Sequence, residues 1–302
     1  MKKIIALVLA FVMVCSVFAG CSGNASGESG EQKDYSAMTI DELKSELTTI
    51  SDGKLTMVTS PDFAPYEFYA LDEEGNPTLA GFDIALGQYI ADYLGLELEI
   101  VPMDFDGTIS ELGAGKADIG MAGYSPDPDR ENAMSFSNIY YTGGQSFVCH
   151  VDNTASFATL EDANKAEYQI GAQIGSIQAD LANTHTPDAD VVELAKVTDI
   201  IAEVIGGKLD GAFVETVVAE TYAKNYPELA VVLDVPYDQE GSVIGVDKDN
   251  PALLAAVNLA IQAALEDGSM SSFVAEANEL STGEKYEGLL SEEGDVPTEA
   301  AE

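Results

Sequence analysis

Arg130 is the residue whose chemistry stands out in this sequence. It is one of 13 basic residues against 53 acidic ones, and it follows the segment Asp127-Pro128-Asp129 directly. A guanidinium group presents a planar fork of N–H donors that can bind a carboxylate through two parallel, charge-assisted hydrogen bonds. The residue type therefore indicates a carboxylate clamp. The alternative is a surface arginine that pairs with Asp127 or Asp129.

Ser176 and Ile177 offer a second way to hold an anion, because they follow a predicted strand and open a predicted helix. The first N–H groups of a helix lack partners inside the helix and carry the positive end of its dipole. Glu215 also stands at the start of a predicted helix. An acid there is ordinarily an N-cap or first-turn residue of the helix that follows from Thr216.

Other kinds of site are not indicated. The two histidines, His150 and His185, lie far apart in the sequence, and we find no Gly-rich phosphate loop or nucleophile elbow. We therefore expect no metal, no cofactor and no catalytic residue. The formal net charge of −40 would repel phosphate backbones, so nucleic-acid binding is not expected. Such an acidic surface also favours a monomer.

The first twenty residues read as a targeting segment. Two lysines precede the apolar run 4–14, which is too short for a comfortable membrane span. The pair Ala19-Gly20 before Cys21 resembles a bacterial lipobox, which implies cleavage before Cys21 and a lipid on its thiol. An ordinary secretory signal is the alternative. The stretch 22–32, rich in Gly, Ser and Glu, then indicates a flexible tether.

The remaining sequence alternates between strand and helix patterns. The expected strands are 55–58, 96–100, 118–121, 147–151, 168–172, 191–194, 212–214, 231–233 and 242–246. The expected helices are 39–50, 82–93, 108–114, 177–182, 199–205, 217–223, 253–265 and 271–280. This order predicts an α/β fold with mainly parallel sheets and right-handed crossovers.

Six short motifs occur in a fixed order along this alternation. They are TSPDFAPYEF at 59–68, GFDI at 81–84, 112–118 ending in GKAD, AGYSPDPDR at 122–130, GS at 175–176 and GKLDGAFVE at 207–215. Each motif alone is weak, but the order and spacing together are specific. The sequence resembles the extracellular solute-binding proteins of polar amino-acid ABC transporters, bacterial solute-binding protein family 3. The resemblance covers about residues 54–280.

The resemblance implies a two-lobe, periplasmic-binding-protein-like fold of type II, in which each lobe is a mainly parallel sheet flanked by helices. The expected parts are a signal peptide at 1–20, a lipid-anchored tether at 21–38, a short N-terminal helix in 39–52, lobe 1 at 53–142 plus 241–283, hinge segments at 143–144 and 237–240, lobe 2 at 145–236 and an acidic tail at 284–302. Lobes of this kind close on a ligand by bending at a few hinge residues.

The resemblance also implies contacts to a free amino acid. The predicted ligand-binding residues are Ser60, Phe63, Phe105, Gly123, Ser125, Arg130, Gln173, Ser176, Ile177 and Glu215. Arg130 and Ser125 would bind the ligand carboxylate, together with the N–H groups at Ser176 and Ile177. Glu215, at a position that is usually Asp in the family, would bind the ammonium, with help from the Gly123 carbonyl.

Phe63 and Phe105 match positions that sandwich the ligand side chain in the family, and Ser60 and Gln173 would contact its end. Several family members carry an acid where Ser60 stands. Asp62 or Glu67 could supply that negative charge instead, and the sequence leaves open which of them faces the cleft.

The implied function is the substrate-binding component of an amino-acid ABC importer. Its partners would be a free amino acid, the transporter permease and the cell membrane, to which a lipid on Cys21 would attach it. The protein would face the extracellular side or the periplasm. Two alternatives stay open: a cyclohexadienyl-dehydratase-like enzyme on the same fold, with Glu215 as general acid, or a ligand sensor for a membrane receptor. The sequence does not identify the amino acid.

Overall fold

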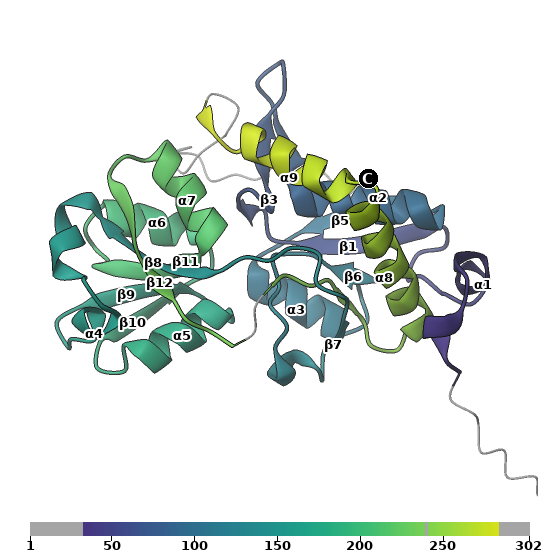
Figure 1. The fold of residues 1–302 in the computed structure, drawn as a ribbon, viewed down its shortest axis with the longest axis horizontal. Coiled ribbons are helices and arrows are strands. Elements are labelled where there is room, and N and C mark those ends of the chain that lie inside the picture. Colours follow the sequence, from purple (N-terminus) through teal and green to yellow (C-terminus); the bar gives the residue numbers. More distant parts are fainter. Residues whose placement is uncertain (1–32, 239–240, 284–302) are drawn as a thin grey trace, which may run out of the picture. The chain divides into compact units, whose positions relative to one another are not determined.

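The computed structural model describes residues 33–238 and 241–283. The predicted signal peptide, the lipidation site Cys21, the tether as far as residue 32 and the acidic tail lie outside the described residues. The hinge positions 239–240 lie outside them too. The described part contains two five-stranded sheets and one three-stranded sheet (Figure 1).

The first five-stranded sheet has the order β5-β1-β6-β13-β7. Its strands are β1 (Lys54–Thr59), β5 (Glu97–Pro102), β6 (Ile119–Gly120), β7 (Met134–Phe136) and β13 (Gly245–Asp247). Strand β1 pairs in parallel with β5 and β6, whereas β13 pairs antiparallel with β6 and β7. One face packs against α2 (Phe82–Leu94) and α8 (Pro251–Glu266), and α9 (Ser269–Leu280) packs on both helices. Helix α3 (Phe105–Gly113) covers the other face.

The second sheet has the order β10-β9-β11-β8-β12. Its strands are β8 (Gln145–His150), β9 (Gln169–Gln173), β10 (Asp190–Leu194), β11 (Gly211–Glu215) and β12 (Leu229–Val235). Strand β9 pairs in parallel with β10 and β11, and β8 pairs antiparallel with β11 and β12. Helices α6 (Val197–Ile205) and α7 (Thr216–Asn225) lie on one face, with α4 (Leu160–Ala163) and α5 (Ile177–His185) on the other (Figure 1).

The antiparallel strand in each sheet is the one that the chain enters from the other sheet. The chain leaves β7 of the first sheet and enters β8 of the second; it later leaves β12 and enters β13. A chain that arrives from the neighbouring lobe starts its strand at the edge that faces that lobe, so it runs opposite to the parallel strands, which end there. We call the parts built on the first and second sheets lobe 1 and lobe 2. The predicted alternation of strands and helices is confirmed, and each sheet combines parallel and antiparallel pairs.

The three-stranded sheet was not predicted. Its strands β2 (Asp62–Phe63), β3 (Glu67–Leu71) and β4 (Pro77–Ala80) pair antiparallel between β1 and α2, and β3 and β4 pack on α2 of lobe 1. The Asp72 carboxylate closes the β3–β4 turn by accepting hydrogen bonds from the N–H groups of Glu74 and Asn76. The same turn contains Gly75 at a φ of 84°, a left-handed conformation that favours glycine, so the sequence carried a turn signal at this place.

The N-terminal helix is shorter than predicted. Thr39 and Glu42 form the expected capping box at the start of α1 (Ile40–Lys44). The helix does not reach residue 50, because the buried Asp118 carboxylate accepts hydrogen bonds from the N–H groups of Ile50 at 2.9 Å and Thr56 at 2.7 Å. A distant partner therefore holds the end of the predicted helix in another conformation. The short 3₁₀ helices η1 (Tyr35–Ala37), η2 (Pro128–Arg130) and η3 (Val151–Ser156) complete the described elements.

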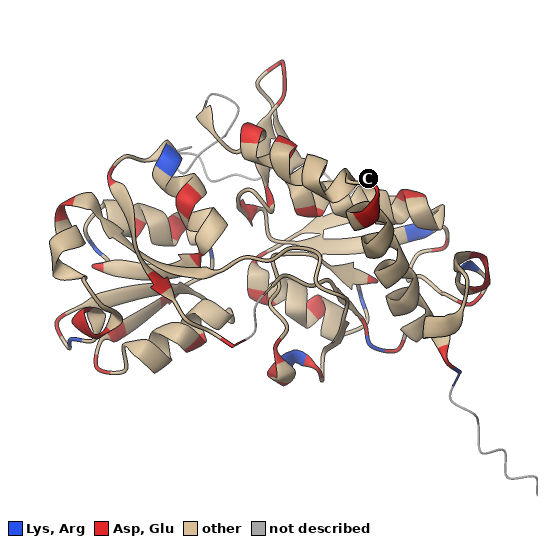
Figure 2. Cartoon of the chain, viewed as in Figure 1, with Lys and Arg blue, Asp and Glu red and all other residues tan. Residues whose placement is uncertain are grey.

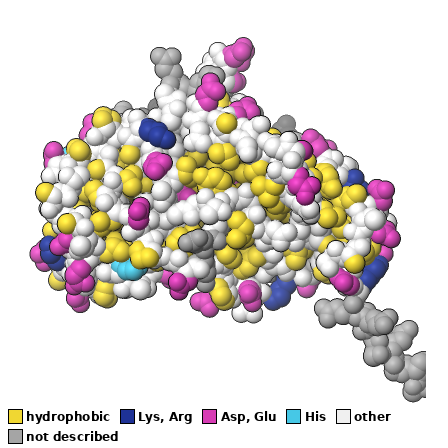
Figure 3. All heavy atoms as spheres, in the orientation of Figure 1, with side chains coloured by type: hydrophobic (Ala, Val, Ile, Leu, Met, Phe, Trp, Pro, Cys, Tyr) yellow, Lys and Arg dark blue, Asp and Glu magenta, His cyan; other side chains and the backbone are white. Residues whose placement is uncertain are grey.

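Charge is distributed unlike the apolar side chains. Figure 2 shows acidic residues scattered over the helices and loops around both large sheets, with far fewer basic ones. On the face drawn in Figure 3, hydrophobic side chains gather near the middle while acidic ones are spread between and around them. None of the described helices has the length and apolar character needed to cross a bilayer.

Candidate functional site

The predicted site residues follow the carboxyl ends of parallel strands. Ser60 comes directly after β1, and Gln173 and Glu215 are the last residues of β9 and β11. In open α/β sheets, ligands bind in the crevice outside the carboxyl ends of the strands. Hydrogen bonds join the two lobes at this edge, so the predicted residues from both lobes meet there.

Arg130 is the only arginine of the sequence, and it ends η2 in lobe 1. Its side chain is buried, with 8% of the residue exposed. The Nη2 group donates a 2.9 Å hydrogen bond to the Gly175 carbonyl of lobe 2, and Nε lies 3.5 Å from Asp127 Oδ2. The pairing with Asp127 that we considered as the alternative is therefore present, but Arg130 is not a surface residue.

Phe105, the first residue of α3, packs its ring against the Arg130 guanidinium. Its ring centre lies 5.6 Å from the guanidinium carbon, within cation–π range. Burial lowers the pKa of Arg130, and the charge of Asp127 acts against that shift. The group stays cationic at neutral pH because an arginine pKa starts so high. The structure thus places Phe105 against Arg130, whereas the sequence had placed it against the ligand side chain.

Ser176 and Ile177 open α5 in lobe 2 as predicted. Ser176 is the N-cap, and its side chain accepts a hydrogen bond from Ala179 N at 3.3 Å. The preceding Gly175 has a φ of 72°, a left-handed conformation that favours glycine, and its carbonyl is the group that Arg130 binds. The start of α5 and the Arg130 guanidinium therefore meet at one point of the interlobe boundary.

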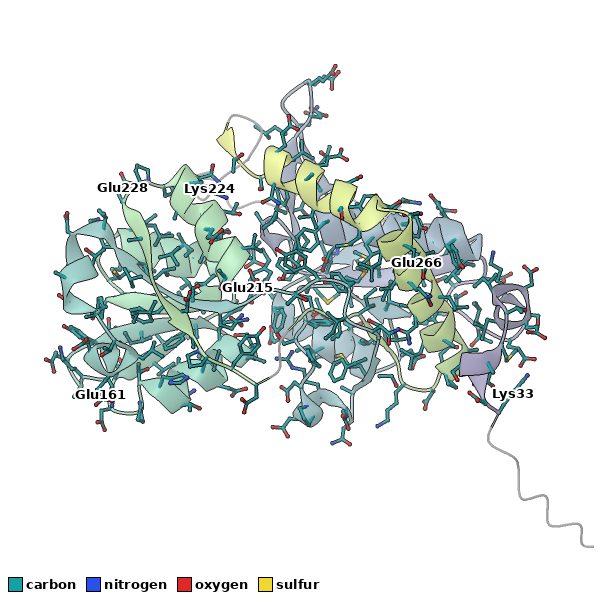
Figure 4. All side chains as sticks on the ribbon, in the orientation of Figure 1. Lys33, Glu161, Glu215, Lys224, Glu228 and Glu266 are labelled. Atoms are coloured by element: carbon teal, nitrogen blue, oxygen red, sulfur yellow. The ribbon has the colours of Figure 1, made fainter. Side chains whose placement is uncertain are left out.

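Glu215 ends β11 and is the N-cap of α7, with one carboxylate oxygen 3.0 Å from Val218 N. Its other oxygen lies 3.4 Å from the Tyr66 hydroxyl of lobe 1. In Figure 4, Glu215 lies beside the segments that connect the two sheets. Only 4% of the residue is exposed, and burial raises its pKa to about 7 despite the hydrogen bonds that favour the carboxylate. The N-cap alternative is thus correct in geometry, and the second carboxylate oxygen faces Tyr66 and Gly143 at the interlobe boundary.

Gly143 and Tyr66 surround Glu215, and neither was among the predicted ligand-binding residues. A Cβ atom on Gly143 would lie 2.2 Å from Glu215 Oε1, so this position has no room for a side chain. The Tyr66 hydroxyl is also 2.9 Å from the Ser242 hydroxyl, near the second crossing between the lobes. The available sequence signal was the place of Tyr66 in the 59–68 motif, one residue before Glu67.

Gly123, Ser125 and Phe63 lie on the lobe 1 side. Gly123 has a φ of 58°, and its N–H donates to Asp83 at 3.2 Å. A Cβ there would meet the Phe63 ring at 2.7 Å, so the glycine lets the ring pack on the backbone. Ser125 is buried. Phe63 and Phe105 belong to different hydrophobic clusters, so the structure does not bring the two predicted aromatic walls into one cluster.

Asp62, rather than Glu67, is at the interlobe boundary. Its carboxylate accepts a hydrogen bond from the Ser60 hydroxyl at 2.9 Å and lies 3.4 Å from the Gln173 amide nitrogen of lobe 2. It also accepts a hydrogen bond from Val197 N. Burial raises the pKa of Asp62 to about 6, against the effect of these donors. Three predicted or considered residues, Ser60, Asp62 and Gln173, are therefore brought together.

Glu67 lies inside lobe 1, fully buried beside Asp83. Burial and the neighbouring Asp83 charge raise the pKa of Glu67 well above its ordinary value. Asp83 accepts hydrogen bonds from Gly123 N and from the Tyr140 hydroxyl, the latter at 2.7 Å. Through its hydrogen bond from Gly123 N, Asp83 of this buried pair holds the loop that contains Gly123.

A family model describes most of the chain: residues 55–276 match the bacterial extracellular solute-binding proteins, family 3. The chain belongs to this family. The arginine-binding extracellular protein ArtP of Bacillus subtilis (strain 168) is 28% identical over 289 residues, which cover 94% of this chain and 100% of that protein.

Solved structures agree. The amino acid ABC transporter substrate-binding protein AbpA from Streptococcus pneumoniae, bound to L-arginine, superposes with a TM-score of 0.73 at 30% identity. The match covers 80% of this chain and 99% of AbpA. The predicted family and the two-lobe type II fold are confirmed. The predicted function, the substrate-binding component of an amino-acid ABC importer, is confirmed as well.

An enzyme is also among the relatives. The cyclohexadienyl dehydratase of Pseudomonas aeruginosa is 25% identical over 183 residues, which cover 61% of this chain and 67% of the enzyme. The matches to the binding proteins ArtP and AbpA cover more of this chain, and more of the matched protein, than the dehydratase match does. They favour the binding function over the dehydratase alternative.

Proposed function

We propose that this chain captures a free amino acid with a cationic side chain, arginine first among them, and delivers it to an ABC permease without chemical change. In this proposal the protein acts as a monomer and is held at the membrane by a lipid on Cys21. The ligand contacts are the ten residues predicted from the sequence.

The observation that carries the proposal is the pair Arg130 and Glu215. They are buried, carry opposite charges and come from opposite lobes. Buried charges are costly unless they are paired, and no ion pair between these two residues is among those that the described part of the chain contains. A zwitterion supplies each of them with a further partner: its carboxylate for Arg130, which already pairs with Asp127, and its ammonium for Glu215.

The preference for a cationic side chain rests on two supports. The relatives with high coverage are arginine-binding proteins by name, and one was solved with L-arginine. In addition, Ser60 and Gln173 form a polar end of the site beside Asp62, opposite in character to the Arg130 end. A hydroxyl and an amide oxygen there can accept hydrogen bonds from a guanidinium or ammonium group.

Calorimetry with the mature protein tests this proposal. Arginine should bind with the highest affinity, lysine and ornithine less tightly, and citrulline, which lacks the side-chain charge, at least tenfold more weakly. Arginine amide and N-acetylarginine, each missing one main-chain charge, should bind poorly. Equal affinity for arginine and citrulline would contradict the cationic preference, and strong binding of the amide would contradict the Arg130 clamp.

The dehydratase alternative predicts a different result. Glu215 would then have to transfer a proton, whereas in this structure it caps α7 and faces Tyr66. We expect no turnover when the protein is incubated with prephenate or arogenate. Turnover that is lost in Glu215→Gln would establish the enzyme instead.

Membrane attachment has its own test. Cys21→Ala should remove the acyl acceptor, so the protein should leave the membrane fraction or remain unprocessed. Cys149→Ala is the matched control, because Cys149 is buried in lobe 2 and should not affect anchoring. Unchanged processing and membrane retention in Cys21→Ala would remove the lipid-anchor proposal.

Lobe closure depends on the proposed hinge at 143–144 and 237–240. Small-angle X-ray scattering should give a smaller radius of gyration once a saturating ligand is added. An unchanged radius, with binding verified in the same sample by calorimetry, would contradict a large closing motion.

A further inference from the structure

The cap of helix α6 comes from the other lobe. Lys196, the N-cap residue of α6, makes no side-chain capping hydrogen bond. The N–H of Val197, the first helical residue, instead donates to the Asp62 carboxylate. Asp62 belongs to β2, which pairs with β3 and is attached to lobe 1. An N-cap acid normally stands next to its helix in the sequence; here it stands 135 residues away.

Two further groups of lobe 2 converge on the same residue. The Tyr222 hydroxyl of α7 donates a 2.9 Å hydrogen bond to the Asp62 carbonyl, and the Gln173 amide of β9 lies 3.4 Å from its carboxylate. Together, α6, α7 and β9 form a socket of donors for one residue of lobe 1. Phe63 and Tyr66, which follow Asp62 in the sequence, pack in the same hydrophobic cluster as Val197, Ile200 and Tyr222.

We propose that Asp62 is an interlobe latch, a positioning residue that holds the lobes closed over the ligand by capping α6 with a carboxylate oxygen. The proposal rests on the proposed function, because it assumes that the lobes close on a ligand. It differs from a direct role in ligand recognition, since the latch needs an oxygen acceptor at Asp62 and does not need its charge.

Two substitutions separate the latch from a ligand contact. Asp62→Asn keeps an acceptor oxygen for Val197 N–H and loses the charge, whereas Asp62→Ala loses both. A latch predicts that Asp62→Asn binds arginine within about threefold of wild type. Asp62→Ala should bind about tenfold more weakly, the typical value of one hydrogen bond to a charged group. The loss should be the same for arginine and for citrulline, because the latch does not contact the ligand side chain.

Kinetics and stability add readouts that a merely structural residue would not show. The latch forms only after closure, so stopped-flow binding of Asp62→Ala should show an increased dissociation rate and an unchanged association rate. Asn250→Ala is the matched control, since Asn250 caps α8 within lobe 1 through Leu253 N at 3.1 Å. That control should lower the melting temperature with and without arginine and leave the affinity unchanged.

Hydrogen exchange at the Val197 amide tests the latch in the closed protein, prepared with whichever amino acid binds most tightly in the calorimetric comparison. The amide should be protected in the wild type and in Asp62→Asn and should exchange faster in Asp62→Ala. Equal protection in all three proteins would overturn the latch. So would an Asp62→Asn protein that loses as much arginine affinity as Asp62→Ala, because Asp62 would then act through its charge. A wild type that fails to bind arginine contradicts the proposed ligand and leaves the amide measurement valid.

Discussion

The two lobes offer different kinds of groups to the space between them. In lobe 2, three parallel strands end there and helices begin directly after them: α5 after β9, α6 after β10 and α7 after β11. In lobe 1, β1 is followed by the three-stranded sheet and β6 by an irregular segment that ends in η2. Lobe 2 therefore contributes three helix starts, whereas lobe 1 contributes one, that of α3 after β5, together with side chains from short elements and turns, chiefly Arg130 of η2, Asp62 of β2 and Tyr66.

This difference bears on which lobe contacts which part of the ligand. Backbone N–H groups at a helix start recognise the negative end of any amino acid and are insensitive to the side chain that carries them. Side chains on loops can be exchanged without rebuilding a sheet. We infer that both lobes recognise the charges common to all amino acids, lobe 1 through Arg130 and lobe 2 through the start of α5 and Glu215, and that lobe 1 supplies most of what distinguishes one amino acid from another.

Arg130→Ala is expected to give the largest loss. The ligand carboxylate would be desolvated without its main side-chain partner, at a cost of about 2–5 kcal/mol, or roughly thirtyfold or more in affinity. Calorimetry measures the loss, and circular dichroism checks folding. Lys116→Ala is the matched control, because Lys116 lies on the surface and pairs with Glu111. A folded Arg130→Ala protein with wild-type affinity would show that the site is misassigned and would remove the main chemical support for an amino-acid ligand.

Glu215→Gln should cause a smaller loss, about tenfold at pH 8, and should change the pH dependence. Glu215 has a pKa of about 7 without ligand, and a bound ammonium group would lower it. Protons therefore compete with the ligand as the pH falls through 7, and wild-type affinity should drop by up to tenfold per pH unit. The glutamine side chain of the Glu215→Gln protein does not titrate, so the affinity of this variant should change little between pH 8 and pH 5.5. A wild type with constant affinity over this range would contradict the role of Glu215.

The ligand-free protein should show the opposite trend in stability. Burial raises the pKa values of Asp62, Asp83 and Glu215 above their ordinary values, to about 6, 6 and 7. Stability from such acids is fully present below the unfolded-state pKa and is lost as the pH rises through the folded-state pKa. The melting temperature without ligand should therefore fall from pH 5 to pH 8. The increase caused by arginine should grow over the same range, and differential scanning fluorimetry can record both.

Tyr66→Phe should have the smallest effect. It removes a hydroxyl that contacts Glu215 and Ser242 but keeps the buried ring. We expect about a threefold loss of affinity, since the contact with Glu215 is long at 3.4 Å. Tyr89→Phe, which removes an exposed bond to Asp267 in lobe 1, is the control and should bind normally. A Tyr66→Phe loss as large as that of Arg130→Ala would make this tyrosine a principal ligand contact.

Local sequence signals predicted the elements well where the cause was local. The capping box at Thr39 and the N-cap Ser176 start helices as expected. Helix α6 was expected from Asp199 but begins at Val197, because its cap is Asp62 of the other lobe. No pattern near residue 197 records a partner at residue 62.

The candidate site shows the same limit. Residue chemistry singled out Arg130, and the resemblance supplied Glu215 and Gly123. Neither gave the contact of Phe105 with Arg130 or the choice between Asp62 and Glu67, since both depend on how separate loops pack. The predicted lobe boundaries and ligand contacts stay predictions until binding is measured.

The order in which strands are added to the two sheets has a consequence for biosynthesis. All five strands of the second sheet lie within residues 145–235, so that sheet has its full set once β12 has left the ribosome or the export channel. The first sheet is different, because β13 at Gly245–Asp247 fits between β6 and β7. Until β13 arrives, β7 has no strand partner in that sheet. The lobe whose sequence begins first is thus completed last, and a chain that stops before residue 245 would retain one whole sheet and one interrupted sheet.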